Sequence, residues 1–276
     1  MRPGSAPEGH RRPQRPLKRD EIWSDRGATS VLTPLRNSPL KGKISVSNGV
    51  LQMPPKPEKA LLFDIDGTLA DTDSLHLEAF NLILGPRGHV FDHERFTREL
   101  QGFSMASIRE RFLANELPAR QVPIMEEKEE AFRSLVSGQI KPTPGLLALL
   151  NHADQADIPM VAVTNAPRLN AEMLLAGLDI THRFKAVIIG DELPHGKPHP
   201  MPYLEGLRAV NAAPNLSVAF EDSRSGVKSA SSAGIATVGI RTSLSHTAMI
   251  EAGAIATAKT FDEPELMSLI AAKMNW

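Results

Sequence analysis

Cysteine is absent from the 276 residues of this chain, and long hydrophobic runs are absent as well. Without cysteine the chain has neither disulfide bonds nor thiolate metal sites, which suits a reducing compartment. No run approaches the roughly 20 apolar residues of a membrane-spanning helix, and no signal-peptide core stands near the N-terminus. We therefore expect a soluble, cytoplasmic protein with no membrane partner.

Apolar residues make up 41% of the chain, enough for a substantial core. The length fits one large domain or a domain with a sizeable insertion. The net charge of −1 hides an asymmetry, because residues 1–56 hold eleven Lys and Arg against four Asp and Glu. Twenty basic and twenty-eight acidic residues remain for the rest, so the two parts of the chain differ physically.

The basic segment, residues 1–56, also holds eight of the 22 prolines and shows no sustained periodicity. Such a segment buries too little apolar surface to offset its ordering entropy, so we predict a disordered tail. Basic tails can bind nucleic acid or acidic membranes, and Arg-rich starts resemble transit peptides, although such peptides avoid acids such as Glu8 and Asp20. A start of translation at Met53 is a further reading. We favour a solvated tail or a start at Met53, with no nucleic-acid partner.

The most informative stretch is an apolar run, residues 60–65, that ends in two carboxylates, Asp64 and Asp66, followed by Gly67. A short apolar run bounded by turn signals predicts a buried strand, and alternation along a strand points both carboxylates the same way. Gly67 lets the backbone pass close to whatever they bind. Two like charges side by side repel each other, so the pair indicates a bound cation or a proton-sharing task.

The chain after this strand falls into two regions. Residues 75–140 predict several helices, and the Glu-Glu-Lys-Glu-Glu run at 126–130 predicts a solvent-exposed helix face. From residue 142 onward strands alternate with helices, which indicates a parallel sheet covered on both faces. The predicted strands are 159–164, 185–189, 216–220 and 236–240, and the predicted helices are 144–152, 169–177, 202–210, one that ends at 233, and 263–273.

The predicted fold is therefore α/β, with a doubly wound, Rossmann-like parallel sheet as its core. Residues 57–74 and 141–276 form this core domain, and residues 75–140 are inserted after its first strand as a helical cap domain. In open parallel sheets the ligand lies outside the carboxyl ends of the strands. The polar residues expected at that edge beside Asp64 and Asp66 are Thr164, Asn165, Lys197, Glu221 and Asp222.

The Asp-Ile-Asp-Gly-Thr-Leu hexapeptide that begins at Asp64 resembles the first motif of the haloacid dehalogenase (HAD) superfamily, most of whose members are Mg²⁺-dependent phosphatases. Thr164, Lys197 and the Glu-Asp-Ser sequence at 221–223 resemble its second, third and fourth motifs. The resemblance extends over residues 58–274. The hexapeptide after an apolar strand is a strong signal by itself. The other three matches are weak alone, but their joint placement after successive strands favours the functional interpretation.

The resemblance implies phosphoryl transfer, which depends mostly on positioning and on charge stabilisation. Asp64 is the expected nucleophile, and Asp66 the group that protonates the leaving oxygen and later takes a proton from water. The Thr164 hydroxyl and the backbone N–H of Asn165 would hold phosphate oxygens, and Lys197 would neutralise their charge.

The resemblance also implies a Mg²⁺ ion, which screens the repulsion between a carboxylate nucleophile and a phosphate. Asp64, the backbone carbonyl of Asp66, and Asp222 are the expected ligands. Glu221 is either a further ligand or a supporting group behind the ligands.

The helical insertion resembles the cap of the β-phosphoglucomutase and sugar-phosphatase branch. His76 aligns with a histidine of that mutase, and Thr72 with its hinge threonine. Where the mutase has a cap lysine and a cap arginine, this chain has Gln101 and Met105. Losing both cations removes the groups that would hold a second phosphate, so hydrolysis is preferred over mutase activity. Arg109, one turn beyond, is a candidate substitute, and we expect His76, Gln101 and Arg109 among the substrate-binding residues.

Two other branches are disfavoured by single residues. Dehalogenases of this superfamily lack the second acid of the first motif, which is Asp66 here. Phosphonate-cleaving members need a cap lysine, and the predicted cap holds only Lys128, which we expect on the exposed acidic face. We therefore predict a Mg²⁺-dependent phosphatase of a small phosphorylated metabolite, either a sugar phosphate or a phosphoglycolate-like compound, acting through an aspartyl-phosphate as a monomer or weak dimer. The alternatives are a β-phosphoglucomutase-like mutase and a non-catalytic binding module on this fold.

Overall fold

The computed structural model describes residues 45–47, 50–52, 58–136, 138 and 140–276. The chain divides into two units, Met1–Pro54 and Pro55–Trp276. In the first unit, strands β1 (Ser45–Ser47) and β2 (Val50–Gln52) pair antiparallel, which the sequence did not predict. Most of the predicted disordered tail, residues 1–56, lies outside the described residues.

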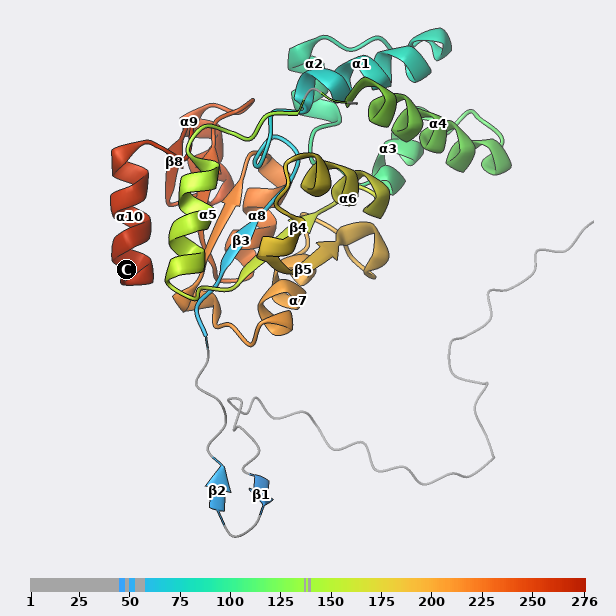
Figure 1. Ribbon diagram of the computed structural model, residues 1–276. Coiled ribbons are helices and arrows are strands. Elements are labelled where there is room, and N and C mark those ends of the chain that lie inside the picture. Colours follow the sequence, from blue (N-terminus) through green and yellow to red (C-terminus); the bar gives the residue numbers. More distant parts are fainter. Residues whose placement is uncertain (1–44, 48–49, 53–57, 137, 139) are drawn as a thin grey trace, which may run out of the picture. The chain divides into compact units, whose positions relative to one another are not determined.

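A six-stranded parallel sheet forms the centre of the second unit (Figure 1). Its spatial order is β5-β4-β3-β6-β7-β8. The strands are β3 (Leu61–Phe63), β4 (Met160–Thr164), β5 (Phe184–Ile189), β6 (Val218–Glu221), β7 (Ala236–Ile240) and β8 (Ala256–Ala258). The strand that precedes the acid pair, β3, is thus central, between β4 and β6.

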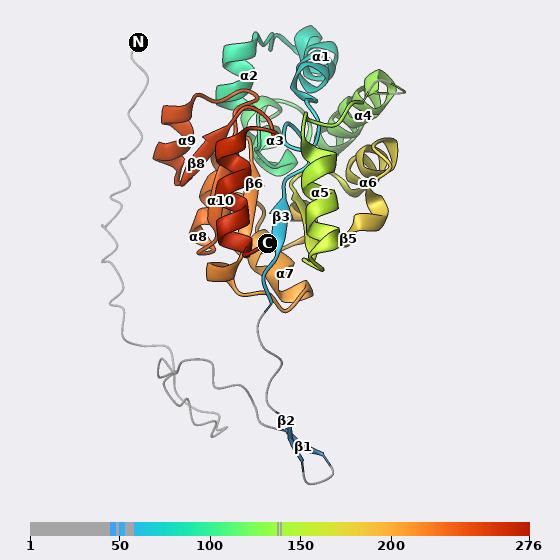
Figure 2. The same ribbon diagram turned by 60° about the vertical axis from the view of Figure 1, so that its left-hand side comes forward.

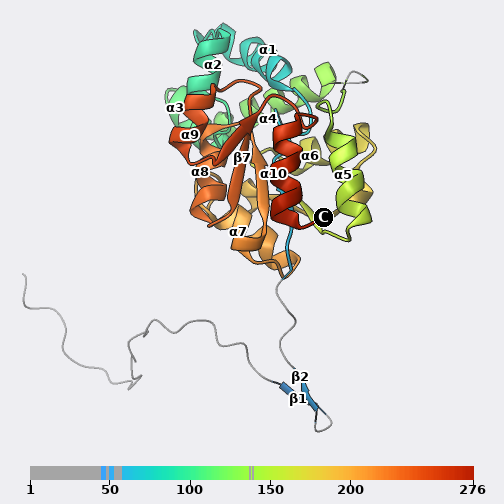
Figure 3. The same ribbon diagram turned by 90° about the vertical axis from the view of Figure 1, so that its left-hand side faces the viewer.

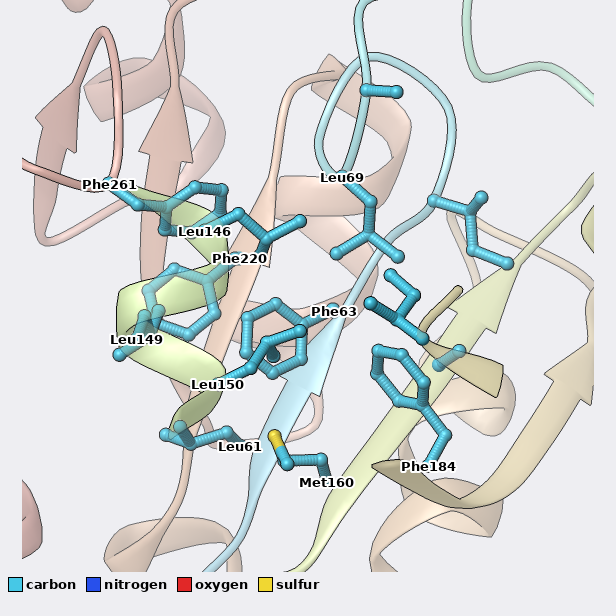
Figure 4. Close-up of a cluster of buried hydrophobic side chains, with 14 of the residues drawn as sticks. Leu61, Phe63, Leu69, Leu146, Leu149, Leu150, Met160, Phe184, Phe220 and Phe261 are labelled. Carbon is cyan, nitrogen blue, oxygen red and sulfur yellow. The ribbon is translucent and has the colours of Figure 1, made fainter. Parts of the chain in front are cut away.

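Helices cover both faces of this sheet, as Figures 2 and 3 show. Alternation along β3 sends Phe63 to one face and Leu62 to the other, so every residue of the strand is buried. The Phe63 ring stacks on that of Phe220, with centroids 4.8 Å apart, and Figure 4 shows the leucines of α5 packed over them. The predicted doubly wound α/β core is confirmed.

The core helices fall into two layers. On the Phe63 face lie α5 (Leu146–Gln155), α6 (Arg168–Gly177) and α10 (Pro264–Met274); on the Leu62 face lie α7 (Met201–Ala209) and α8 (Arg224–Ser232), with α9 (His246–Ala252) against α8. Short 3-10 turns connect them: η2 (Thr181–Arg183), η3 (Gly190–Glu192) and η4 (Pro214–Leu216). The sequence missed α9 and β8, because β8 consists of Ala-Thr-Ala and α9 buries only Met249, so neither shows an apolar pattern.

Between β3 and α5 the chain forms what we call the cap helices: α1 (Asp73–Leu84), η1 (Gly85–Arg87), α2 (His93–Glu99), α3 (Met105–Phe112) and α4 (Pro118–Val136). They share an apolar cluster of their own that includes Phe80, Phe91, Phe96 and Ile108. Figures 1 and 2 show them beyond the end of the sheet toward which β3 runs. No helix in the described part of the chain has the length and apolarity needed to span a membrane.

Candidate active site

The carboxyl ends of three adjacent strands bring most of the predicted residues together. Asp64 follows β3, Thr164 ends β4, and Glu221 ends β6 with Asp222 next in the chain. Gly67, with φ +74°, closes the turn after the acid pair. A Cβ atom at this position would lie 2.1 Å from an Asp222 side-chain oxygen, so the close approach of the two loops requires glycine.

Three buried carboxylates form a cluster at this edge. One oxygen each of Asp64, Glu221 and Asp222 lie within 4.8 Å of one another, and this is the one group of three potential metal-ligating side chains found among the described residues. Burial raises the pKa of Asp64 to about 8, although Lys197 opposes the rise, and burial and neighbouring acids raise the pKa of Asp222 well above its usual value. The environment of the cluster therefore favours bound protons, or a cation in their place.

Lys197 is the cation already present in this cluster. Its Nζ lies 2.5 Å from Asp64 Oδ1 and 2.6 Å from Glu221 Oε1, and it donates to the Val163 carbonyl at 2.8 Å. Burial alone would lower the pKa of Lys197, but the two carboxylates outweigh it and raise the pKa. The three ammonium hydrogens thus have three acceptors, which fixes the head group beside the expected nucleophile.

Glu221 is held on its other side by a residue that the sequence analysis missed. The Tyr203 hydroxyl donates to Glu221 Oε1 at 2.6 Å, and Ser223 Oγ donates to Oε2 at 3.3 Å. Both Tyr203 and Glu221 are fully buried. Lys197 and Tyr203 both donate to Glu221 Oε1, so Glu221 holds the lysine in place. This matches the second of the two roles considered from the sequence, a supporting group behind the metal ligands.

Thr164 and Asn165 line the cavity above the cluster. The Thr164 hydroxyl accepts from the backbone N–H of Ala166 at 2.9 Å. The Asn165 amide accepts from the backbone N–H of Lys197 at 3.0 Å and donates to its carbonyl at 3.1 Å. The Asn165 side chain therefore positions the Lys197 loop.

Asp66 faces the cap helices rather than the acid cluster. Its Oδ1 accepts from Thr72 Oγ1 at 2.9 Å and lies 3.0 Å from His76 Nε2. Burial opposes the effect, but these hydrogen bonds hold the pKa of Asp66 below its usual value. The two aspartates of the first motif, two positions apart, thus have opposite electrostatic environments.

Lys128 corrects the sequence analysis, which placed it on an exposed helix face. It is fully buried, and its Nζ donates to His76 Nδ1 at 2.9 Å and to Glu129 Oε1 at 3.0 Å. Because an ammonium group only donates, Nδ1 of His76 accepts, and its Nε2 carries the hydrogen that is donated to Asp66. Burial lowers the pKa of Lys128. Its two hydrogen-bond acceptors and the Phe80 ring, which faces the ammonium group, compensate for the lost contact with water.

The error came from treating the charged run at 126–130 as one face. Glu126, Glu127 and Glu130 are exposed as predicted, but Lys128 and Glu129 lie on the side of α4 that carries Ile124, Met125, Phe132 and Val136. The apolar spacing of those four residues was the available signal, since helical periodicity places 128 and 129 between them. The argument from Lys128 against a phosphonate-cleaving enzyme loses its premise.

The loop between α2 and α3 brings the cap into contact with the acid cluster. Gln101 Nε2 donates to Asp222 Oδ2 at 2.7 Å and to Asp73 Oδ2 at 3.0 Å, and Gly102 accepts through its carbonyl from Ser225 Oγ at 2.6 Å. Asp73 is a second residue that the sequence analysis missed. Its carboxylate is buried and bonded, which no spacing signal indicates.

One cavity of about 80 Å³ lies between the cap helices and the sheet edge, and most of the predicted site residues line it. They include Asp64, Asp66, His76, Gln101, Thr164, Asn165, Lys197 and Asp222, together with Lys128 and Glu129. Glu221 lies behind Lys197. Arg109 does not line the cavity; it lies near Asp191, where its charge opposes the rise that burial imposes on the pKa of Asp191.

The family model described as haloacid dehalogenase-like hydrolase matches residues 61–240, which is more than half of the chain. The chain belongs to this family. The predicted family is thereby confirmed, and the matched region runs from β3 through the cap helices to β7.

Relatives within the haloacid dehalogenase-like family agree with the predicted class of enzyme, a phosphoric monoester hydrolase. The chain is 32% identical over 207 residues to a phosphorylated carbohydrates phosphatase of Thermotoga maritima, covering 73% of this chain and 94% of the relative. It is 31% identical over 182 residues to the fructose-1-phosphate phosphatase YqaB of Escherichia coli, covering 66% and 95%. Among solved structures, a mutant of CbbY from Rhodobacter sphaeroides in complex with xylulose-(1,5)bisphosphate has a TM-score of 0.65 at 29% identity, covering 75% of this chain and 96% of that one.

Proposed function

We propose that this protein is a Mg²⁺-dependent phosphatase that hydrolyses a small phosphorylated metabolite, a sugar phosphate or phosphoglycolate-like compound, through an aspartyl-phosphate. One observation carries the proposal: Asp64 lies 2.5 Å from Lys197 within a buried carboxylate cluster, at the floor of a cavity that the cap helices roof. The relatives named as phosphatases of phosphorylated carbohydrates and of fructose 1-phosphate support the substrate class.

The donor atoms fit a magnesium ion. The cluster offers only carboxylate oxygens, which are hard ligands, and it offers no sulfur or imidazole. Asp64, Asp222 and the backbone carbonyl of Asp66 would hold the ion, since the Glu221 oxygens already accept from Lys197, Tyr203 and Ser223. When bound, the ion screens the charge repulsion between nucleophile and phosphate.

The side chains of the site then divide the two chemical steps. A carboxylate oxygen of Asp64 forms the bond to phosphorus while the bond to the leaving oxygen breaks, and Asp66 gives that oxygen a proton. Water then attacks phosphorus, Asp66 takes its proton, and the Asp64 carboxylate is released with phosphate. Lys197 and the Thr164 hydroxyl stabilise the phosphoryl oxygens in both steps.

Asp66 needs a proton before the first step, yet its hydrogen bonds hold its pKa below the usual value. The negative charge of an arriving phosphate ester raises the pKa of a neighbouring carboxylate. The substrate therefore favours the protonated form of Asp66, and His76 and Thr72 keep its carboxyl group aimed at the cavity.

Hydrolysis remains preferred over mutase activity. Gln101 is bonded to Asp73 and Asp222, and Met105 has no charge, so neither replaces the two cations of the mutase. Arg109, the candidate substitute, lies outside the cavity lining. The intact set of Asp64, Asp66, Thr164, Lys197 and Asp222 argues against a non-catalytic binding module.

Release of phosphate from a generic aryl phosphate, with Mg²⁺ and with a chelator, tests the proposal. We expect turnover with Mg²⁺, its loss with the chelator, and a phosphorylated species in the intact mass of the Asp66→Asn variant. Failure to release phosphate under both conditions contradicts the proposal. Formation of glucose 6-phosphate from β-glucose 1-phosphate without free phosphate indicates the mutase instead.

A further inference from the structure

Glu129 is a buried carboxylate on the cap side of the cavity, and the phosphoryl transfer steps do not use it. Its Oε1 accepts from Lys128, and its Oε2 accepts from Asn170 Nδ2 at 2.5 Å. Asn170 lies on core helix α6, and its Oδ1 accepts from Arg133 at 2.9 Å, which leaves its amide nitrogen for Glu129. Donors from both the cap and the core therefore fix the carboxylate in the cavity wall.

This carboxylate keeps free capacity for hydrogen bonds. A carboxylate accepts about four hydrogen bonds and cannot donate, and Glu129 accepts two from the described residues. Because Glu129 lines the cavity, the remaining lone pairs suit donors on a bound molecule. Hydroxyl groups of a substrate are such donors, whereas a second anionic group is repelled.

The cavity offers no uncommitted cation for a second anion. Among the described residues that line it, the only Lys or Arg side chains are Lys128 and Lys197. Lys197 is paired with Asp64 and Glu221, where the transferred phosphate is expected, and Lys128 is paired with Glu129 itself. An anionic group on the leaving side of the substrate would thus lie near the carboxylates of Glu129 and Asp73, and no uncommitted Lys or Arg in the cavity lining would neutralise its charge.

We propose that Glu129 is a specificity-determining residue that selects substrates with a neutral, hydroxyl-bearing leaving group and discriminates against those with a carboxylate or a second phosphate. The inference rests on the proposed phosphatase function and narrows it to monophosphates of sugars or polyols. It separates two kinds of compound that appear in the names of similar proteins, since one is named for fructose 1-phosphate and a mutant of another was solved in complex with a bisphosphate.

Two compounds of the same skeleton provide the test. Glycerol 3-phosphate and 3-phosphoglycerate differ at one carbon, a hydroxymethyl group in the first and a carboxylate in the second. We expect kcat/KM of the wild-type protein with Mg²⁺ to be at least about tenfold higher for glycerol 3-phosphate. The Glu129→Gln variant, of nearly the same shape but without charge, should bring the ratio within about threefold of unity by raising kcat/KM for 3-phosphoglycerate.

The neighbouring Glu130 provides a matched control. Glu130 is exposed on the same helix, so Glu130→Gln removes the same charge without touching the cavity and should keep the wild-type ratio. Glu129→Asp retains the charge and should keep most of the discrimination. A merely structural role of Glu129 would lower both substrates equally and leave the ratio unchanged.

A measurement on the wild-type protein covers the case in which Glu129→Gln does not fold. Both compounds should inhibit aryl phosphate hydrolysis, with 3-phosphoglycerate needing at least about tenfold higher concentration. Suppose that the protein hydrolyses the aryl phosphate but treats glycerol 3-phosphate and 3-phosphoglycerate equally, or prefers 3-phosphoglycerate. That result overturns the proposed role of Glu129 and leaves the proposed phosphatase function standing. A wild-type protein that hydrolyses none of the three esters overturns the proposed function, and this inference with it.

Discussion

The two walls of the cavity are built in different ways. On the core side, each functional group follows a strand of one parallel sheet, and Lys197 meets Asp64 across 133 positions of the chain. On the cap side, the groups come from helix faces, and Lys128 pairs with its direct neighbour Glu129. The topology of a parallel sheet alone places the side chains at its strand ends along a common edge. Which side chains of a helix point into the cavity depends instead on how the helix is rotated against its neighbours.

The core wall should carry the chemistry itself. Asp64→Asn is expected to lower kcat for aryl phosphate hydrolysis by at least about 10³-fold, because the amide is not a nucleophile. Thermal unfolding followed by circular dichroism should show that the fold persists. Asp157→Asn provides the control, since Asp157 is exposed and its φ of +52° suits asparagine. Equal activity of the Asp64 variant and the control would remove Asp64 as the nucleophile.

The two buried lysines compare the walls directly. Lys197→Met should lower kcat/KM by about 10²- to 10³-fold, because it removes a cation beside the transferred phosphate. It should also reduce the free energy of unfolding by about 3 kcal/mol, since the buried carboxylates of Asp64 and Glu221 lose the cation that neutralises them. Lys128→Met should lower kcat/KM by only about tenfold, because Lys128 acts on Asp66 through His76. Steady-state kinetics and urea unfolding measure both, and a larger kinetic effect at Lys128 would reverse the assignment of the chemistry to the core wall.

The sequence allowed the core wall to be predicted almost completely. Apolar runs of four to six residues identify the buried strands, and polar residues directly after them must share an edge. Asp64, Thr164 and Asp222 lie where this reasoning puts them. Tyr203 was missed, because a tyrosine on the buried face of a helix looks like any other core aromatic until its hydroxyl is seen on Glu221.

The cap wall could be predicted only as a set of helices. His76 was found through resemblance, but Lys128 was assigned to solvent from the charge of its neighbours. A buried charge shows no hydropathy signal of its own, and its burial depends on partners from other helices, here His76 on α1. The sequence analysis missed Asp73 and Glu129 for the same reason, because their partners are distant in the chain. Asp73 accepts from Gln101 and Ser243, and Glu129 accepts from Asn170.

The contact between the two walls can be tested at Gly102. A Cβ atom there would lie 2.5 Å from Ser225 Oγ and 2.6 Å from Ser223 Oγ, and the residue has φ +72°. Gly102→Ala should therefore push the cap loop off the core and lower kcat/KM by about tenfold. Gly88→Ala is a matched control, because Gly88 has φ +87° but no atom within 4 Å of its Cβ position.

Both substitutions should reduce the free energy of unfolding by about 1 kcal/mol through backbone strain. Only Gly102→Ala should change the kinetics. Equal kinetic effects of the two variants would mean that the loop contact with Ser223 and Ser225 does not position the cap.

The two aspartates of the first motif should differ in how pH changes the stability of the protein. The pKa of Asp64 is raised from its ordinary value of 3.8 to about 8 in the folded protein. In the presence of a chelator, and between these two pH values, the folded state therefore holds a proton that the unfolded state has lost. The free energy of unfolding should therefore fall as pH rises from 4 to 8, by at most about 1.4 kcal/mol per pH unit for this group. Asp64→Asn should reduce this slope, with the raised pKa of Asp222 maintaining the remainder.

Asp66 should behave in the opposite way, because His76 and Thr72 of the cap side lower its pKa. Its stabilisation is complete above the ordinary pKa of 3.8 and is lost as pH falls through the lower folded value. Asp66→Asn should thus leave the slope between pH 4 and 8 intact, and urea unfolding at intervals from pH 3 to 8 distinguishes the variants. Mg²⁺ needs the ionised cluster, so it should stabilise the wild-type protein more at pH 8 than at pH 5, and Asp64→Asn much less. Suppose instead that the pH dependence of stability between pH 4 and 8 survives in Asp64→Asn but disappears in Asp66→Asn. The assignments of the two aspartates would then have to be exchanged, with Asp66 in the acid cluster and Asp64 in the network that the cap holds.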